Sequence, residues 1–71
     1  MKFDIWMEGF SITGNNGIAK FLGTYEADSF LDACQIAANN HPEYGDYDSE
    51  SNDIWGCRLF DNETDARKSF G

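Results

Sequence analysis

The first residues of the chain alternate between apolar and polar side chains. Phe3, Ile5 and Met7 occupy every second position within residues 2–12, which is the period of a strand that buries one face. Residues 13–17 are rich in glycine and asparagine, which tolerate the positive φ angles of tight turns. We therefore expect a strand with Phe3, Ile5 and Met7 toward the core, followed by a hairpin turn.

The returning strand, residues 18–27, has two candidate inner faces. Successive side chains of a strand point to opposite sides, so one set faces the core and the other faces away from it. We expect Phe21, Tyr25 and Ala27 to point inward, and Ile18 and Leu22 to point outward.

A helix is predicted from residue 30 onward. Ser29 is a favourable N-cap, and Asp32 three residues later makes a weak capping box. The residue before Pro42 avoids the helical conformation, so the helix ends near His41. At 3.6 residues per turn, one apolar stripe faces the sheet: Phe30, Leu31, Ala33, Cys34, Ala37 and Ala38.

An acidic segment and a third strand follow the helix. Residues 43–53 contain five acids, two tyrosines and a glycine without periodicity, which predicts an exposed acidic loop. Residues 54–60 predict a strand with Trp55, Cys57 and Leu59 on one face. Asn62 can cap a short final helix, because acids follow it in the first turn and bases in the last.

These elements predict an α+β fold in a single domain, residues 1–71. Two hairpin strands, a helix, a third strand and a short helix make a two-layer ββαβ(α) sandwich. If the third strand pairs beside the first, the three-stranded sheet is antiparallel with order 2-1-3, and the main helix covers one face through a right-handed crossover. This arrangement leaves the second face of the sheet without an obvious cover.

That second face is the strongest predicted contact surface. Alternation places apolar residues from all three strands on it: Trp6, Phe10, Ile12, Leu22, Ile54 and Phe60. An exposed apolar patch of this kind is typical of a partner surface. Three alternatives are open: the C-terminal helix folds back over the patch through Phe70, a second copy of the chain covers it, or a different protein does.

The negative charge is concentrated in the middle of the chain. The formal net charge is -8. Residues 21–57 contain no Lys or Arg but eight acids, which are Glu26, Asp28, Asp32, Glu43, Asp46, Asp48, Glu50 and Asp53. Such a segment disfavours direct contact with nucleic acid and favours a basic partner. Asp46, Asp48 and Glu50 of the acidic loop are therefore candidate partner-binding residues.

The sequence carries no recognisable catalytic, cofactor or metal signature. His41 is the one histidine, and no serine or cysteine is placed by sequence to be activated by it. Residues 46–53 have oxygen ligands at alternate positions, but the Gly and Glu that an EF-hand needs are replaced by Ser51 and Cys57. Cys34 and Cys57 are expected to be buried thiols. We therefore expect neither an enzyme nor a bound cofactor or metal.

Three stretches of the chain are distinctive. Residues 55–63 read WGCRLFDNE and residues 66–71 read ARKSFG, while residues 22–30 read LGTYEADSF. They resemble the ending and the middle of a family of short proteins carried by bacteria and by phages or other mobile elements. The resemblance implies a bacterial or phage cytosolic setting and carries no functional residue with it.

The sequence as a whole favours a non-enzymatic binding or regulatory module. Its partner is expected to be another protein or a second copy of the chain, bound through the apolar sheet face and the rim of the acidic loop. The alternative is an acidic inhibitor that mimics nucleic acid, in which fixed carboxylates stand in for the phosphates of a duplex. Without a membrane-spanning stretch or a signal-like start, we expect a cytoplasmic protein that does not bind membranes.

Overall fold

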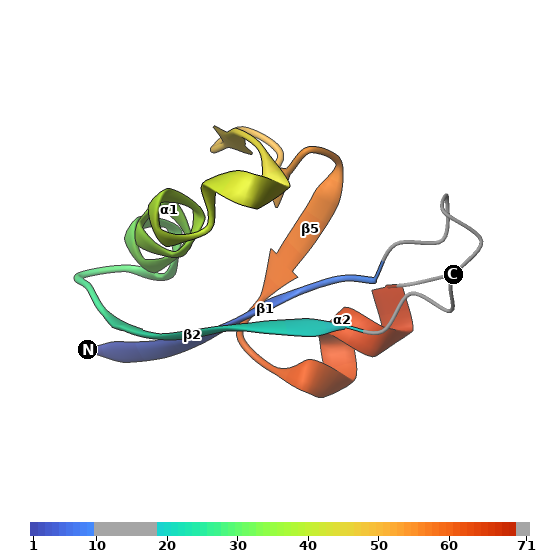
Figure 1. Cartoon of the computed structure of the whole chain (residues 1–71). Helices are drawn as coiled ribbons and strands as arrows, with labels where there is room; N and C mark the ends of the chain where they lie inside the picture. Colours follow the sequence, from blue (N-terminus) through green and yellow to red (C-terminus); the bar gives the residue numbers. More distant parts are fainter. Residues whose placement is uncertain (10–18, 70–71) are drawn as a thin grey trace.

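The computed structural model describes residues 1–9 and 19–69 (Figure 1). The fold class is α+β, as predicted. The elements in chain order are β1 (Lys2–Met7), β2 (Lys20–Glu26), α1 (Phe30–Asn40), the 3-10 helix η1 (Pro42–Tyr44), β3 (Tyr47–Asp48), β4 (Asp53–Ile54), β5 (Cys57–Phe60) and α2 (Glu63–Ser69). The predicted turn at residues 13–17, the predicted outer-face residues Phe10 and Ile12, and Phe70, through which the C-terminal helix could fold back over that face, lie outside the described residues.

The described strands form one sheet in the order β2-β1-β5-β4-β3, with every pair antiparallel. Its first three strands match the predicted 2-1-3 order, because β5 lies beside β1 with Phe60 opposite Trp6. The prediction of only three strands is wrong. Two further short strands, β3 and β4, form where we expected a loop, and Tyr47 pairs there with Ile54.

The inner face of β2 also differs from the prediction. Its pairing with β1 shifts between Ile5 and Trp6, so that Gly23 lies opposite Ile5 but Phe21 lies opposite Trp6. Leu22 is the extra residue of this bulge and is buried, whereas Phe21 is 51% exposed. Gly23 permits the bulge because its φ angle of +126° is one that L side chains rarely adopt. The expectation that Phe21 points inward and Leu22 outward is therefore wrong.

Residues 54–60 form a hairpin rather than the single strand expected. Ile54 ends β4, Cys57 begins β5, and the two residues pair across the turn. The turn residues Trp55 and Gly56 have φ angles of 53° and 88°, and a two-residue type I′ turn requires positive φ at both. Because the chain reverses here, Ile54 shares the buried side with Cys57 and is 1% exposed. Its predicted place in the outer patch is therefore wrong.

The core lies between the sheet and α1, which covers the inner face of β1 and β2 (Figure 1). The Ser29 side chain accepts a hydrogen bond from the backbone N–H of Asp32 at 3.1 Å, which confirms the predicted N-cap. Phe3, Tyr25 and Ala27 pack at the edge of the core. Its buried members are Ile5, Met7, Leu22, Ala33, Cys34, Ala37, Ala38, Ile54, Cys57 and Leu59.

The second helix, α2, lies on the face of the sheet opposite α1 (Figure 1). It packs against β5 and β1, and Ala66 is fully buried. Asn62 accepts a hydrogen bond from the backbone N–H of Asp65 at 2.8 Å, which confirms its capping role. The predicted two-layer arrangement thus gains a partial third layer. Within the described residues, no helix is long and apolar enough to cross a membrane.

Candidate functional site

Three aromatic side chains lie in a row across the outer face of the sheet. Trp6 of β1 lies opposite Phe21 of β2 and Phe60 of β5, and the ring centroids of Trp6 and Phe21 are 4.9 Å apart. Trp6 and Phe60 are half-buried, on the side of the sheet where α2 packs. The contact face predicted from the sequence is therefore smaller than expected, because Leu22 and Ile54 belong to the core.

The candidate acids of the predicted loop lie on and beside the β3–β4 hairpin. Asp46, Asp48 and Glu50 are all exposed. Asp48 also has a structural role, since its Oδ1 accepts a hydrogen bond from the backbone N–H of Glu50 at 2.9 Å and closes the turn. Among residues 1–9 and 19–69, no three His, Cys, Asp or Glu side chains are grouped as metal ligands would be. The hairpin thus presents three carboxylates to solvent.

Trp55 is the residue that the sequence analysis missed. It is 71% exposed and occupies the first position of the β4–β5 turn. A bulky residue with a positive φ angle is strained, whereas asparagine, aspartate and glycine adopt this conformation readily. Backbone strain of this kind gathers at functional sites. The available signal was the dipeptide Trp55-Gly56 between two apolar residues, because a two-residue loop containing glycine is typical of a hairpin.

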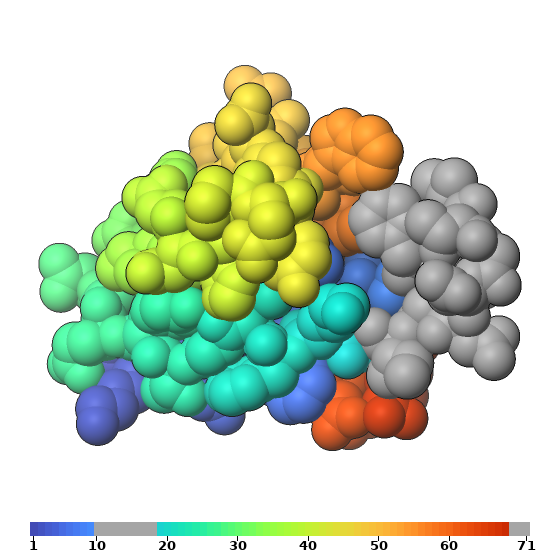
Figure 2. Space-filling view, viewed as in Figure 1, coloured from blue at the N-terminus to red at the C-terminus, as the bar shows by residue number. Residues whose placement is uncertain are grey.

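A hollow of about 300 Å³ lies beside this turn. We call it the Trp55 hollow, and its lining residues are Pro42, Glu43, Tyr44, Gly45 and Trp55. Gly45 lies against the tryptophan, since a methyl group at position 45 would come within 3.3 Å of the Trp55 Cβ. Figure 2 shows the yellow segment that follows α1 and the orange β4–β5 turn together at the top of the view. Two aromatic rings, a proline and a carboxylate therefore share one concave surface.

His41 holds the η1 side of this hollow in place. Its Nε2 donates a hydrogen bond to the carbonyl oxygen of Leu22 at 2.9 Å, since a carbonyl can only accept. Its Nδ1 lies 3.3 Å from Oε2 of Glu43, and its ring stacks on Tyr44 with centroids 5.7 Å apart. The histidine thus links β2 to two of the side chains that line the hollow, which is a structural role.

Glu43 is the ionised group of the hollow. Two hydrogen bonds lower the pKa of its carboxyl below the ordinary value of 4.5. The larger effect comes from its own backbone N–H and the smaller from His41. Its side chain is 60% exposed. The Trp55 hollow therefore has a negatively charged rim at neutral pH and in mild acid.

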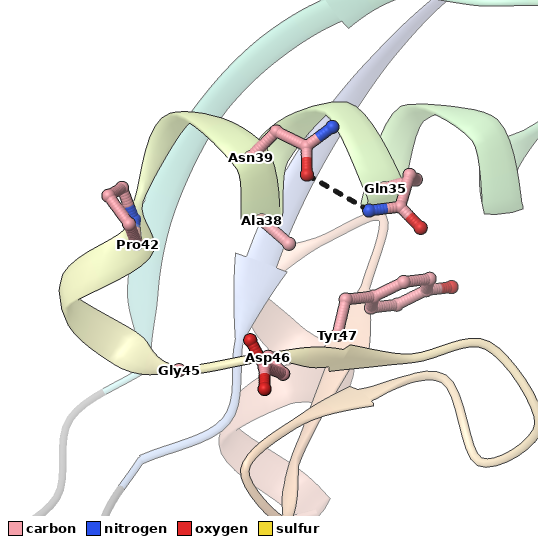
Figure 3. Close-up of a pocket in the computed structure, with 7 residues that line it drawn as sticks. All are labelled: Gln35, Ala38, Asn39, Pro42, Gly45, Asp46 and Tyr47. Carbon is pink, nitrogen blue, oxygen red and sulfur yellow. Dashed lines mark hydrogen bonds between the residues drawn. The ribbon is translucent and has the colours of Figure 1, made fainter.

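A second hollow, of about 400 Å³, shares Pro42 and Gly45 with the first (Figure 3). Within it, Gln35 Nε2 donates a hydrogen bond to Asn39 Oδ1 at 3.0 Å. The hydroxyl of Tyr47 donates to Asn52 Oδ1 at 2.7 Å. Its remaining lining residues are Gln35, Ala38, Asn39, Asp46 and Tyr47. Because three of its polar side chains already bond within the protein, the Trp55 hollow is the stronger candidate.

Both cysteines are buried, as predicted. Burial raises the pKa of the Cys34 thiol to about 12, and a hydrogen bond with the Asn52 side chain offsets this only in part. Burial also raises the pKa of Cys57. The thiolate is the reactive form of cysteine, so both residues are poor nucleophiles at neutral pH.

Comparison with known proteins finds no matching family model, and no curated protein or solved structure matches the chain. The resemblance of residues 22–30, 55–63 and 66–71 to a family of short bacterial and phage proteins thus stays a prediction.

Proposed function

We propose that the protein is a non-enzymatic binding module that contacts another protein through residues 42–56, which we call the acidic lobe. The lobe contains η1, β3, β4 and the β4–β5 turn. The observation that carries the proposal is Trp55, which is 71% exposed in a conformation unfavourable for tryptophan. Stability alone would favour asparagine there, and tryptophan is enriched among the residues that dominate binding energy at protein interfaces.

The charge of the lobe favours a protein partner over nucleic acid or a membrane. Residues 42–56 include no Lys or Arg. Phosphate backbones and anionic lipid headgroups would be repelled by this surface. Asp46, Asp48 and Glu50 are exposed in the same lobe, and we place the protein and its partner in the cytoplasm.

Affinity capture from the cells that naturally produce the protein tests this proposal. The baits are the wild type, Trp55→Asn and Leu31→Ala; Leu31 is 50% exposed on α1 and supplies an apolar control away from the lobe. We expect one stoichiometric partner to be retained by the wild type and by Leu31→Ala and to be lost with Trp55→Asn. Equal retention by all three baits would contradict the proposal.

An acidic inhibitor that mimics nucleic acid is the second candidate function. The exposure of Asp46, Asp48 and Glu50 around one hairpin favours it. Its partner would itself bind nucleic acid, would be displaced by duplex DNA, and would be released steeply by added salt. It would be lost when these three acids are changed to Asn or Gln, and it would survive Trp55→Asn.

A further inference from the structure

We infer that the Trp55 hollow binds a cationic side chain, a lysine or an arginine, presented by the partner protein. The inference rests on the proposed function and specifies the chemistry of its ligand. Three features of the described residues carry it: the aromatic rings, the carboxylate at the rim, and the absence of lysine and arginine from the surrounding segment.

The aromatic rings supply the surface on which a cation can lie. The negative face of an aromatic ring attracts ammonium and guanidinium groups, and tryptophan attracts them most strongly. Tyr44 is held in place by stacking on His41, and Trp55 lies against Gly45. The apolar stem of a lysine or arginine can pack along Pro42 at the same time, because such stems bury readily on apolar surface. Both parts of the guest side chain thus find a complementary contact.

The carboxylate of Glu43 supplies the opposite charge. It lines the same hollow as Trp55 and Tyr44, and with 60% of its side chain exposed it is within reach of a guest. Its contact with His41 at 3.3 Å restricts its position. Hydrogen bonds between ionised partners are stronger than neutral ones, so a cation here gains both a ring contact and a charge-assisted bond.

The surrounding charge favours a cation over an apolar or anionic guest. No Lys or Arg occurs between Phe21 and Cys57, and the base of this segment that lies against Glu43 is His41, whose Nδ1 is 3.3 Å from Oε2. The first base after it, Arg58, is directed toward β1, where its Nε lies 4.0 Å from Oε1 of Glu8. A cationic side chain from a partner would therefore enter a segment in which acids outnumber bases.

Titration with three short peptides tests the inference directly. Each is a capped pentapeptide of glycine with arginine, lysine or norleucine at its centre, and the readout is the indole N–H signal of Trp55 and the amide of Gly45 in NMR spectra of the isotope-labelled wild type. Trp6, on the outer sheet face, is the internal control. We expect the arginine and lysine peptides to shift the Trp55 and Gly45 signals saturably at millimolar concentration, while the norleucine peptide and the Trp6 signal show no such change.

Two charge variants separate a specific contact from general attraction. Glu43→Gln should weaken binding of the arginine peptide about three- to fivefold, toward the upper end of the range for an exposed ion pair. Glu50→Gln removes the same charge from the β3–β4 turn and should change the affinity by less than about twofold, since exposed charges are screened over roughly 8 Å. Equal weakening by both variants would show non-specific attraction and overturn the inference, as would the absence of a saturable shift.

The outcomes also distinguish this inference from the proposed function. If the norleucine peptide binds as well as the arginine peptide, the hollow is an apolar contact site, and the inference fails while the proposed function stands. If the peptides behave as expected but no captured partner depends on Trp55, the proposed function fails while the cation site stands.

Discussion

The main layer, formed by β1, β2 and α1, is built differently from the acidic lobe. Apolar contacts between sheet and helix hold the main layer, where Ile5, Ala33 and Cys34 are 0% exposed. In the lobe, every residue of which is described, Ile54 is the one buried side chain. Hydrophobic stabilisation is roughly proportional to the apolar area removed from water. The lobe must therefore depend more on polar contacts and on backbone conformation.

The polar contacts of the lobe centre on Asn52. The hydroxyl of Tyr47 donates to its Oδ1 at 2.7 Å, and its Nδ2 donates to the carbonyl oxygen of Leu59 at 3.3 Å. Its backbone carbonyl oxygen also accepts from the N–H of Leu59 at 3.1 Å. One asparagine thus joins β3 and β5 through the turn that precedes β4.

Asn52 and Trp55 then show what the difference between the two regions means. Their φ angles are nearly equal, 55° and 53°. Asparagine tolerates this conformation, whereas a bulky side chain does not. Trp55 thus has a backbone conformation that is unfavourable for its side chain, and it is an exposed residue that lines a hollow. Such departures are expected at functional sites and rare elsewhere.

Removing the buried anchor of the lobe should have the largest effect. Ile54→Ala truncates a side chain that is 1% exposed, and it should lower the free energy of unfolding by about 3 kcal/mol. Ile5→Ala, at a fully buried position of the main layer, is the matched substitution. Chemical denaturation measures the loss, and amide hydrogen exchange locates it.

Hydrogen exchange should differ between these two variants if the lobe opens independently. We expect Ile54→Ala to speed exchange in β3 and β4 more than in β1 and β2, and Ile5→Ala to speed exchange in both regions. Regions with few buried apolar contacts open at lower free energy than the core does. A uniform increase in Ile54→Ala would show that the two regions form one cooperative unit.

A methyl group at Gly23 should be the next most damaging change. It would lie 2.8 Å from Oη of Tyr25, whose hydroxyl donates to the carbonyl oxygen of Leu22 at 2.6 Å. Together with the positive φ angle, this clash should cost about 2 kcal/mol in Gly23→Ala. Gly56→Ala is the control, because a methyl group there meets nothing within 4 Å and should cost only about 1 kcal/mol for its backbone conformation. Equal losses on denaturation would show that Tyr25 moves aside.

Alkaline pH should lower the free energy of unfolding through Cys34. Burial holds the pKa of the Cys34 thiol at about 12 instead of the ordinary 9.0. Above about pH 9 the unfolded chain loses this proton while the folded protein keeps it. The contribution of the protonated Cys34 thiol to the free energy of unfolding is therefore fully present below pH 9. It is lost as pH rises toward 12, at up to about 1.4 kcal/mol per pH unit.

Denaturation of the wild type and Cys34→Ala between pH 7 and pH 10 checks this sign. The variant should be less stable at pH 7 but should lose stability less steeply above pH 9. The raised pKa values of Tyr47 and Cys57 act in the same direction, so a residual slope is expected in the variant. Parallel slopes in the two proteins would contradict the role assigned to Cys34.

The two regions also differ in how far the sequence predicts them. Alternation through Ile5 and Met7 and the Ser29 cap predicted the places of β1 and α1, because burial and local hydrogen bonding leave periodic signals, but Leu31, expected to face the sheet, is 50% exposed. The inner face of β2 was predicted wrongly because a bulge beside Gly23 adds one residue to this strand. The alternation of apolar and polar residues does not reveal such an insertion. In the lobe, Trp55 was predicted to be a strand residue because tryptophan favours strands. It lies instead in a turn, and this turn places Ile54 on the buried side together with Cys57.

Trp55→Asn should have the smallest effect on stability and the opposite sign. Asparagine favours the positive φ angle of a type I′ turn, so relief of backbone strain should raise the free energy of unfolding by about 0.5 to 1 kcal/mol, net of the lost contact with Gly45. Trp55→Ala is the control, since it removes the same indole without adding a residue that favours this conformation. We expect the asparagine variant to be the more stable of the two on denaturation, and more stable than the wild type. If both variants are less stable than the wild type by a similar amount, the indole stabilises the lobe by packing, and its exposure no longer indicates a binding role.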